Sequence, residues 1–218
     1  LRKSEIMVGL DIGSSRISDI CPDANGGLWM GTWRGALYFD PSVGASSLRR
    51  FDAGNSPLPG GRTMDVSVAP DGSVWLACFS VSHGGGGLAR YVPGSDTWTV
   101  WSNATEPDGW PGRVLCETAI AQPKPGGGYL IWVDDTFGKV VFDSDTQRFS
   151  EVPFDQQPGD IAAMLHDDAC DDAGNVWMLR YVAPGQGYTL EYRRPDGTWV
   201  QPPQPLPAIY GLPAFRAF

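Results

Sequence analysis

A glycine turn followed by a strand with a central tryptophan recurs along the sequence. It reads NGGLWMGTW at 25–33, DGSVWLACF at 71–79 and AGNVWMLRY at 173–181. Trp29 and Trp75 are 46 residues apart. In GGGYLIWVDD the same offset from the turn falls on Ile131, which lies 56 residues after Trp75 and 46 before Trp177. A period of roughly 40 to 50 residues, with about four short strands in each unit, is typical of a β-propeller blade.

The segments around each tryptophan also follow one order. One strand precedes the turn, the tryptophan strand follows it, a third opens on glycine and a fourth runs outward, as in RISDICPD, GGLWMGTW, GALYFDP and SLRRFDA. Apolar and polar residues alternate in these strands, as a half-buried sheet requires. We place four blades within one domain, 1–218, at 16–55, 62–104, 113–155 and 160–205. The tryptophan strand is expected to pack one blade on the next, so Trp29, Trp75 and Trp177 are interpreted as scaffold.

The composition agrees with an all-β chain. The sequence holds 28 glycines and 19 prolines, more turn-forming residues than a helical protein tolerates. The flanking segments, 1–15 and 206–218, are too short for a further blade, and the chain begins at Leu1 rather than Met. We therefore expect a processed or excised piece of a larger propeller. A closed ring of four blades is the alternative, and the oligomeric state stays open.

Charge and hydropathy argue against two classes of partner. The formal net charge is −9 and the isoelectric point is near 4.6, which disfavours a nucleic-acid phosphate backbone. No apolar run approaches the roughly 18 residues of a membrane span. The four cysteines, Cys21, Cys78, Cys116 and Cys170, lack a CxxC spacing, so we expect no zinc site. One disulfide is compatible with export, and its pairing stays open.

The first unit is similar to the two-component regulator propeller repeat. The similarity is carried by Asp23, Gly27, Leu28, Trp29, Gly31, Thr32, Gly35, Leu37, Phe39, Asp40 and Pro41. The second and fourth units keep much of this pattern, while the third lacks the aspartate before the turn. The resemblance implies a bacterial propeller of the kind that forms the periplasmic sensing part of hybrid sensor kinases and recognises carbohydrate. Streptogramin lyases and gluconolactonase-like hydrolases are related propellers, and the lyases hold a central metal with histidine and glutamate.

Loops at one end of a propeller form a mouth, and such loops carry function while the strands carry stability. The expected mouth loops mix aromatic and charged side chains, which stack on sugar rings and orient a ligand. The predicted ligand-binding residues are Trp33, Arg34, Phe79, His83, Trp110, Asp134, Phe137, Arg180 and Tyr181. A carbohydrate or another small extracellular ligand fits this set. Capping of blade ends is the competing interpretation for each residue.

Metal binding and catalysis are weaker interpretations of the same end. The adjacent carboxylates of Asp134 and Asp135 suit calcium or an acid–base pair, but neighbours on a strand point to opposite faces. The two histidines form no H-x-H arrangement, and His83 lies beside four glycines. The sequence contains no G-x-S-x-G or P-loop motif. We therefore predict no cofactor and no catalytic residue, with calcium as the alternative.

Three functions follow in order of preference. The first is a non-catalytic, periplasmic or extracellular propeller that senses a carbohydrate-like ligand through its mouth. The second is an interaction scaffold that docks a partner protein, or the missing blades of a parent chain. The third is a metal-dependent enzyme of the lactonase or lyase type.

Overall fold

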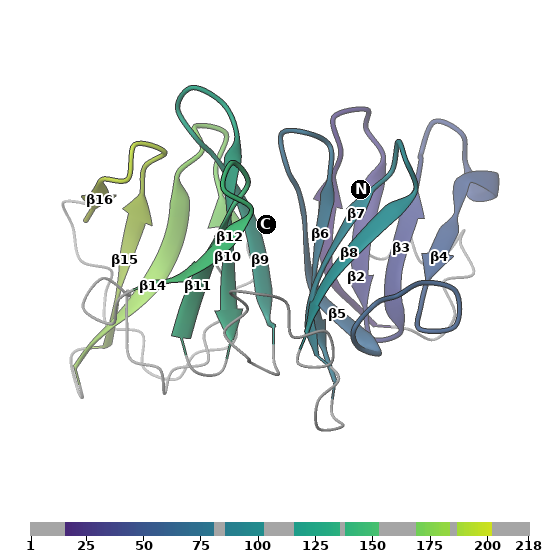
Figure 1. Ribbon diagram of the computed structural model, residues 1–218, viewed down its shortest axis with the longest axis horizontal. Helices are drawn as coiled ribbons and strands as arrows, with labels where there is room; N and C mark the ends of the chain where they lie inside the picture. Colours follow the sequence, from purple (N-terminus) through teal and green to yellow (C-terminus); the bar gives the residue numbers. More distant parts are fainter. Residues whose placement is uncertain are drawn as a thin grey trace.

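The computed structural model describes residues 16–80, 86–102, 116–135, 138–152, 169–183 and 187–201. Within these ranges the strands form four antiparallel sheets of four strands each, and each sheet follows the order of the sequence. This arrangement confirms the predicted all-β architecture of four repeated units (Figure 1). The part of the chain that the structure describes holds no helix long and apolar enough to span a bilayer.

The strands have the following bounds. The first sheet contains β1 (Ile17–Pro22), β2 (Leu28–Thr32), β3 (Gly35–Phe39) and β4 (Arg49–Phe51), with the short 3-10 helix η1 (Ala45–Ser47) before β4. The second contains β5 (Arg62–Val68), β6 (Val74–Phe79), β7 (Gly87–Val92) and β8 (Thr97–Ser102). The third contains β9 (Thr118–Pro123), β10 (Tyr129–Asp135), β11 (Gly138–Asp143) and β12 (Arg148–Glu151). The fourth contains β13 (Ala169–Cys170), β14 (Val176–Ala183), β15 (Gly187–Arg193) and β16 (Trp199–Val200).

The first strands of consecutive sheets lie next to one another. Strand β1 contacts β5, β5 contacts β9, and β9 contacts β13. The fourth strand forms the other edge of each sheet, and β4 and β16 mark the two ends of the row of sheets in Figure 1. Each sheet therefore runs from an inner strand to an outer strand, and the turns and loops gather at the two ends of the strands.

An apolar layer fills the space between each pair of neighbouring sheets. Between the first and second sheets, the rings of Trp29, Phe51 and Tyr91 lie 5.3 to 5.6 Å apart, centroid to centroid. Between the second and third sheets, Trp75 stacks on Trp101 with centroids 5.4 Å apart. These layers confirm that the tryptophans of the first two units are scaffold. In the fourth sheet, Trp177 is half-buried and packs on Tyr192 of the same sheet, with ring centroids 4.4 Å apart.

The assignment of Ile131 to the tryptophan position of the third unit is wrong by one residue. Ile131 packs in the layer against the second sheet, whereas Trp132 packs against Met178 of the fourth. Successive side chains of a strand point to opposite faces, and Trp75 also faces the following sheet. Trp132 is therefore the structural counterpart of Trp75.

The length of the hairpin explains this one-residue error. In the third sheet the N–H of Lys124 donates to the carbonyl of Gly128, which precedes Trp132 by four residues. In the second sheet the corresponding carbonyl belongs to Ser73, only two residues before Trp75. The hairpin of β9 and β10 extends two residue pairs further, and Gly128 lies one position later in its turn than Gly72 does, so counting from the glycine misplaces the strand by one residue.

None of the four cysteines forms a disulfide bond. Cys78 and Cys116 are buried in the layers between sheets, Cys21 is half-buried and Cys170 is exposed. No disulfide therefore contributes to the stability of the described fold.

Candidate functional site

The connection between β2 and β3 holds two of the predicted ligand-binding residues, Trp33 and Arg34. Thr32 ties this turn together, because its hydroxyl donates to the carbonyl of Gly35 at 2.9 Å and accepts the N–H of Arg34 at 3.1 Å. Gly35 has a φ of +98°, and a Cβ atom there would overlap the backbone carbonyl of Phe51. Only glycine fits this position. The tight turn projects Trp33 outward, where its relative exposure is 41%.

Arg62 packs over Trp33. The Arg62 guanidinium carbon lies 4.3 Å from the centroid of the Trp33 ring and 5.8 Å from that of Phe79, at the end of β6. The Arg16 guanidinium carbon lies 5.4 Å from the same Trp33 centroid. These are distances at which a cation is attracted to an aromatic ring. We call the set Arg16, Trp33, Arg34, Arg62 and Phe79 the Trp33 corner.

In both the first and the second sheet, an arginine lies opposite an aromatic residue at this end of the strands. Arg16 lies opposite Trp33 across the first hairpin, where the Trp33 N–H donates to the Arg16 carbonyl at 3.0 Å. Arg62 lies opposite Phe79 across the second hairpin. Contact between the two sheets then brings Arg62 to Trp33. Of the predicted residues, Trp33 and Phe79 are thus brought together around Arg62, and Arg34 follows Trp33 in the same turn.

Sequence reasoning missed Arg16 and Arg62, although a signal was present. RISDI at 16–20 and RTMDV at 62–66 carry an arginine at the same position of the repeat. That position precedes or opens the inner strand, at the end where the connection between second and third strands also lies. Comparing the starts of the inner strands would have found both residues.

The arginines of the corner are electrostatically uncompensated in the described part of the chain. There, no Asp or Glu side chain lies within ion-pair distance of Arg16, Arg34 or Arg62, whereas Arg90 pairs with Asp71 at 2.9 Å. The whole chain carries 25 acidic and 16 basic residues. The corner is thus a local concentration of positive charge on an acidic protein.

Asp134 lies at the same end of the third sheet but is already paired. Its carboxylate forms an ion pair with Lys139, directly opposite on β11, and only 9% of its side chain is exposed. Its backbone N–H donates to the hydroxyl of Thr118 at 3.1 Å. Among the residues that the structure describes, no three His, Cys, Asp or Glu side chains gather to hold a metal ion. At this end of the third sheet, the carboxylate of Asp134 is thus already balanced by the charge of Lys139.

The other predicted site residues are placed less completely. Arg180 and Tyr181, expected in a loop, lie within strand β14, opposite Thr189 and Tyr188 of β15. The remaining three, His83, Trp110 and Phe137, lie outside the described residues.

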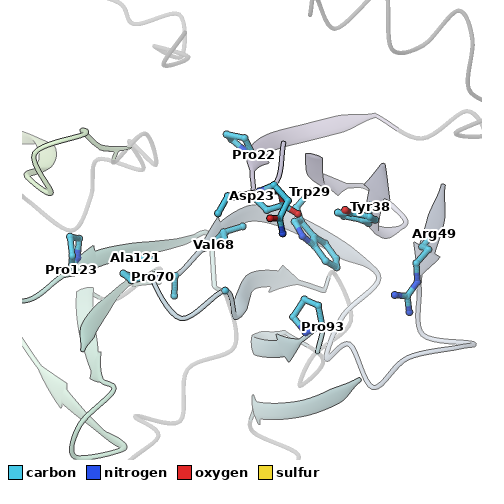
Figure 2. Close-up of a pocket in the computed structure, with 14 residues that line it drawn as sticks. Pro22, Asp23, Trp29, Tyr38, Arg49, Val68, Pro70, Pro93, Ala121 and Pro123 are labelled. Carbon is cyan, nitrogen blue, oxygen red and sulfur yellow. Dashed lines mark hydrogen bonds between the residues drawn. The ribbon is translucent and has the colours of Figure 1, made fainter. Parts of the chain in front are cut away.

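A cavity that sequence reasoning did not predict lies at the opposite end of the strands. It has a volume of about 600 Å³ and is lined by turns and strand ends of the first three sheets. Figure 2 shows Trp29 and Tyr38 side by side in it, with Arg49 at one end and the prolines Pro70 and Pro123 at the other. One acidic residue, Asp23, lines the cavity. Its carboxylate accepts the backbone N–H groups of Asn25 and Gly27 at 2.8 and 2.9 Å, and so holds the turn.

A second groove, of about 680 Å³, lies between the third and fourth sheets. Lys124 in its wall pairs with Asp143 at 2.8 Å and with Asp145 at 2.6 Å. Arg193 lies over Trp132, with its guanidinium carbon 5.0 Å from the ring centroid, and donates to Gln122 at 3.0 Å. These side chains satisfy one another, as expected of a structural junction between sheets.

Comparison with known proteins agrees with the geometry of the sheets. Residues 11–34 match the family model described as the two component regulator propeller. Among solved structures, a chain named as the extracellular domain of a hybrid two component system from B. thetaiotaomicron superposes with a TM-score of 0.55 at 16% identity. The chain has the β-propeller fold. The four sheets are its blades, and the match at 11–34 confirms the resemblance of the first blade to this repeat.

Two further structures show the same fold. One, named as a gluconolactonase, gives a TM-score of 0.55 at 18% identity. The other is PorZ, named as a bacterial surface component of the type-IX secretion system of Porphyromonas gingivalis, with a TM-score of 0.53 at 18% identity. The alignments cover 82%, 87% and 89% of this propeller for the sensor domain, the gluconolactonase and PorZ. They cover only 21%, 64% and 27% of those chains, in the same order. No curated protein sequence matches this chain.

Proposed function

We propose that this chain is a non-catalytic, ligand-binding part of a periplasmic or extracellular propeller, and that it senses a carbohydrate-like ligand at the Trp33 corner. The observation that carries the proposal is the exposure of Trp33. Trp33 and Val43 are the two large hydrophobic side chains that are exposed among the described residues. An indole ring at a loop that faces solvent exposes apolar surface to water, which is unfavourable, and it contributes nothing to the core. This favours a role in binding.

The surroundings of Trp33 support a ligand with a ring and polar substituents. An aromatic surface contacts the apolar face of a sugar, while arginine N–H groups donate to its oxygens. The turn that carries Trp33 is held by Thr32 and Gly35, so the platform is rigid before the ligand binds. The likeness of the fold to an extracellular sensor domain supports the sensing role at the level of the fold.

The test is binding of soluble neutral and acidic oligosaccharides, measured by isothermal titration calorimetry on the whole chain. Trp33→Ala is expected to weaken binding at least about tenfold, because it removes one well-packed aromatic contact. Its far-UV circular dichroism and thermal midpoint should match those of the wild type, because Trp33 lies outside the apolar layers between blades.

Arg49→Ala is the matched control. Arg49 is an exposed arginine in the cavity of Figure 2, at the other end of the strands, and its ion pair with Asp96 is a long 3.5 Å contact. Binding that survives Arg49→Ala but not Trp33→Ala supports the proposed site. The reverse result transfers the site to the cavity and overturns the assignment to the corner. Binding of no oligosaccharide at all overturns the carbohydrate ligand.

A further inference from the structure

We infer that the ligand of the Trp33 corner carries a carboxylate, as a uronic acid residue of an acidic polysaccharide does, and that Arg62 binds this carboxylate. The inference rests on the proposed function, because it names the class of ligand for the same site. Three observations carry it: the position of Arg62 over the Trp33 ring, the absence of a described acidic partner, and the clustering of positive charge.

The two aromatic rings leave the donors of Arg62 available. Its guanidinium carbon is 4.3 Å from the centroid of Trp33 and 5.8 Å from that of Phe79. A planar guanidinium held against rings keeps its N–H groups at its rim, where two of them match the two oxygens of a carboxylate. The rings also limit the side-chain freedom that Arg62 would otherwise lose on binding.

Arg90 and Arg193, which lie over Trp75 and Trp132, already have side-chain acceptors. Arg90 donates to Asp71 at 2.9 Å, and Arg193 donates to Gln122 at 3.0 Å. For Arg62, by contrast, the described residues supply neither a carboxylate nor another side-chain acceptor. The described residues also supply no carboxylate to pair with Arg16, whose guanidinium carbon lies 5.4 Å from the Trp33 centroid. An anionic ligand would supply the partner that the described residues do not provide.

The charge of the whole chain makes this concentration of arginines informative. A net charge of −9 repels anions at long range, so an acidic ligand binds here only if the site is locally positive. Arg16, Arg34 and Arg62 provide that local field. Because Arg62 covers part of the indole, Trp33 both positions Arg62 and offers its remaining exposed surface to the sugar ring.

The experiment compares acidic oligosaccharides with neutral esters of the same shape. The probes are trisaccharides of galacturonate, mannuronate and guluronate, together with their methyl esters, titrated into the whole chain at low and moderate salt. The wild type is expected to bind at least one acid about tenfold or more tightly than its ester, as a charge-assisted bidentate contact predicts. The preference should shrink as salt is added.

Variants assign the preference to Arg62. Arg62→Ala should reduce the acid-to-ester ratio to about threefold or less, while Arg62→Lys, which keeps the charge but not the fork of donors, should give an intermediate ratio. Arg49→Ala should leave the ratio unchanged. Circular dichroism of each variant checks that it remains folded.

The outcomes separate this inference from the proposed function. Equal binding of acid and ester, with loss in Trp33→Ala, overturns the acidic ligand and leaves the carbohydrate-binding corner standing. An acid preference that persists in Arg62→Ala overturns the role of Arg62. Binding of neither acid nor ester, nor of any neutral oligosaccharide, overturns both proposals.

Discussion

Asp65, on the inner strand of the second blade, accepts a hydrogen bond from the backbone N–H of Ala119, on the inner strand of the third blade, at 2.7 Å. One blade earlier, Asp19 accepts the backbone N–H of Val66 at 3.2 Å. The inner strands belong to separate sheets, so these side chains link blades that share no ladder hydrogen bonds. They also satisfy backbone donors that the sheets leave unpaired.

Replacing Asp65 tests this link between blades. Asp65→Ala leaves the Ala119 N–H without its acceptor, and the free energy of unfolding should fall by about 1–3 kcal/mol. Asp65→Asn keeps a side-chain oxygen in the same place and should be at least as stable as the wild type at neutral pH. Urea unfolding of the three proteins measures the difference. Equal losses for alanine and asparagine would show that the hydrogen bond is not the stabilising feature.

The same residue makes stability depend on pH. Burial and the neighbouring negative charge of Asp19 raise the pKa of Asp65 well above its usual range. The folded protein therefore binds this proton more tightly than the unfolded chain, whose aspartates titrate near about 3.9. The stabilising contribution is complete below the unfolded pKa and is lost as the pH rises through the folded one.

Asp65→Asn isolates that contribution. Relative to the variant, the wild type should lose stability between about pH 4 and neutral pH, so the gap in unfolding free energy widens in favour of the variant. Urea titrations at a series of pH values measure it. A gap that stays constant across this window would contradict a raised pKa at Asp65.

Asp71 should give the opposite dependence. Burial opposes its ionisation, but hydrogen bonds from Ser73 and Tyr129, together with the charge of Arg90, lower its pKa. The N–H of Ser73 lies 2.9 Å from this carboxylate, and the Tyr129 hydroxyl, from the next blade, lies 3.0 Å from it. A lowered pKa contributes stability above the unfolded value and loses it as the pH falls through the folded one.

Asp71→Asn is therefore expected to be less stable than the wild type at neutral pH, by about 1 kcal/mol for a partly exposed group. The difference should shrink below about pH 4. Chemical unfolding of both proteins at neutral and acidic pH checks it. If the destabilisation does not change with pH, it arises from the geometry of the asparagine amide and not from the lost charge of Asp71.

Gln122 should be the most sensitive polar residue between the third and fourth blades. It is fully buried, its amide N–H groups donate to the carbonyls of Gly174 and Arg193 at 3.0 and 2.9 Å, and its oxygen accepts the Trp132 indole N–H at 2.9 Å. Gln122→Ala should lower the free energy of unfolding by about 2–4 kcal/mol.

Gln122→Leu is the control for packing volume. Leucine fills similar space but satisfies none of these partners, so it should not restore stability. Recovery of wild-type stability in Gln122→Leu, measured by urea unfolding, would show that volume rather than hydrogen bonding matters at this junction.

Part of the Trp33 corner could be predicted from the sequence. Trp33, Arg34 and Phe79 were found because loops between the second and third strands of a blade share one end. Arg16 and Arg62 were not, because Arg16 directly precedes an inner strand and Arg62 opens one, so each looks like an ordinary strand terminus. The cavity of Figure 2 was also missed, since it forms where turns of three blades meet.

The sequence by itself determined the local architecture: four units, each with a glycine turn, a tryptophan strand and alternating apolar residues. Turn chemistry and period-two patterning act over a few residues, so they can be read without the fold. The tertiary structure decided which face each strand presents to its neighbour. Ile131 and Trp132 are both apolar, and a slip of one residue exchanges the two faces. It also decided that Arg62 of one blade lies on Trp33 of another, because that contact depends on how blades pack and not on any local pattern.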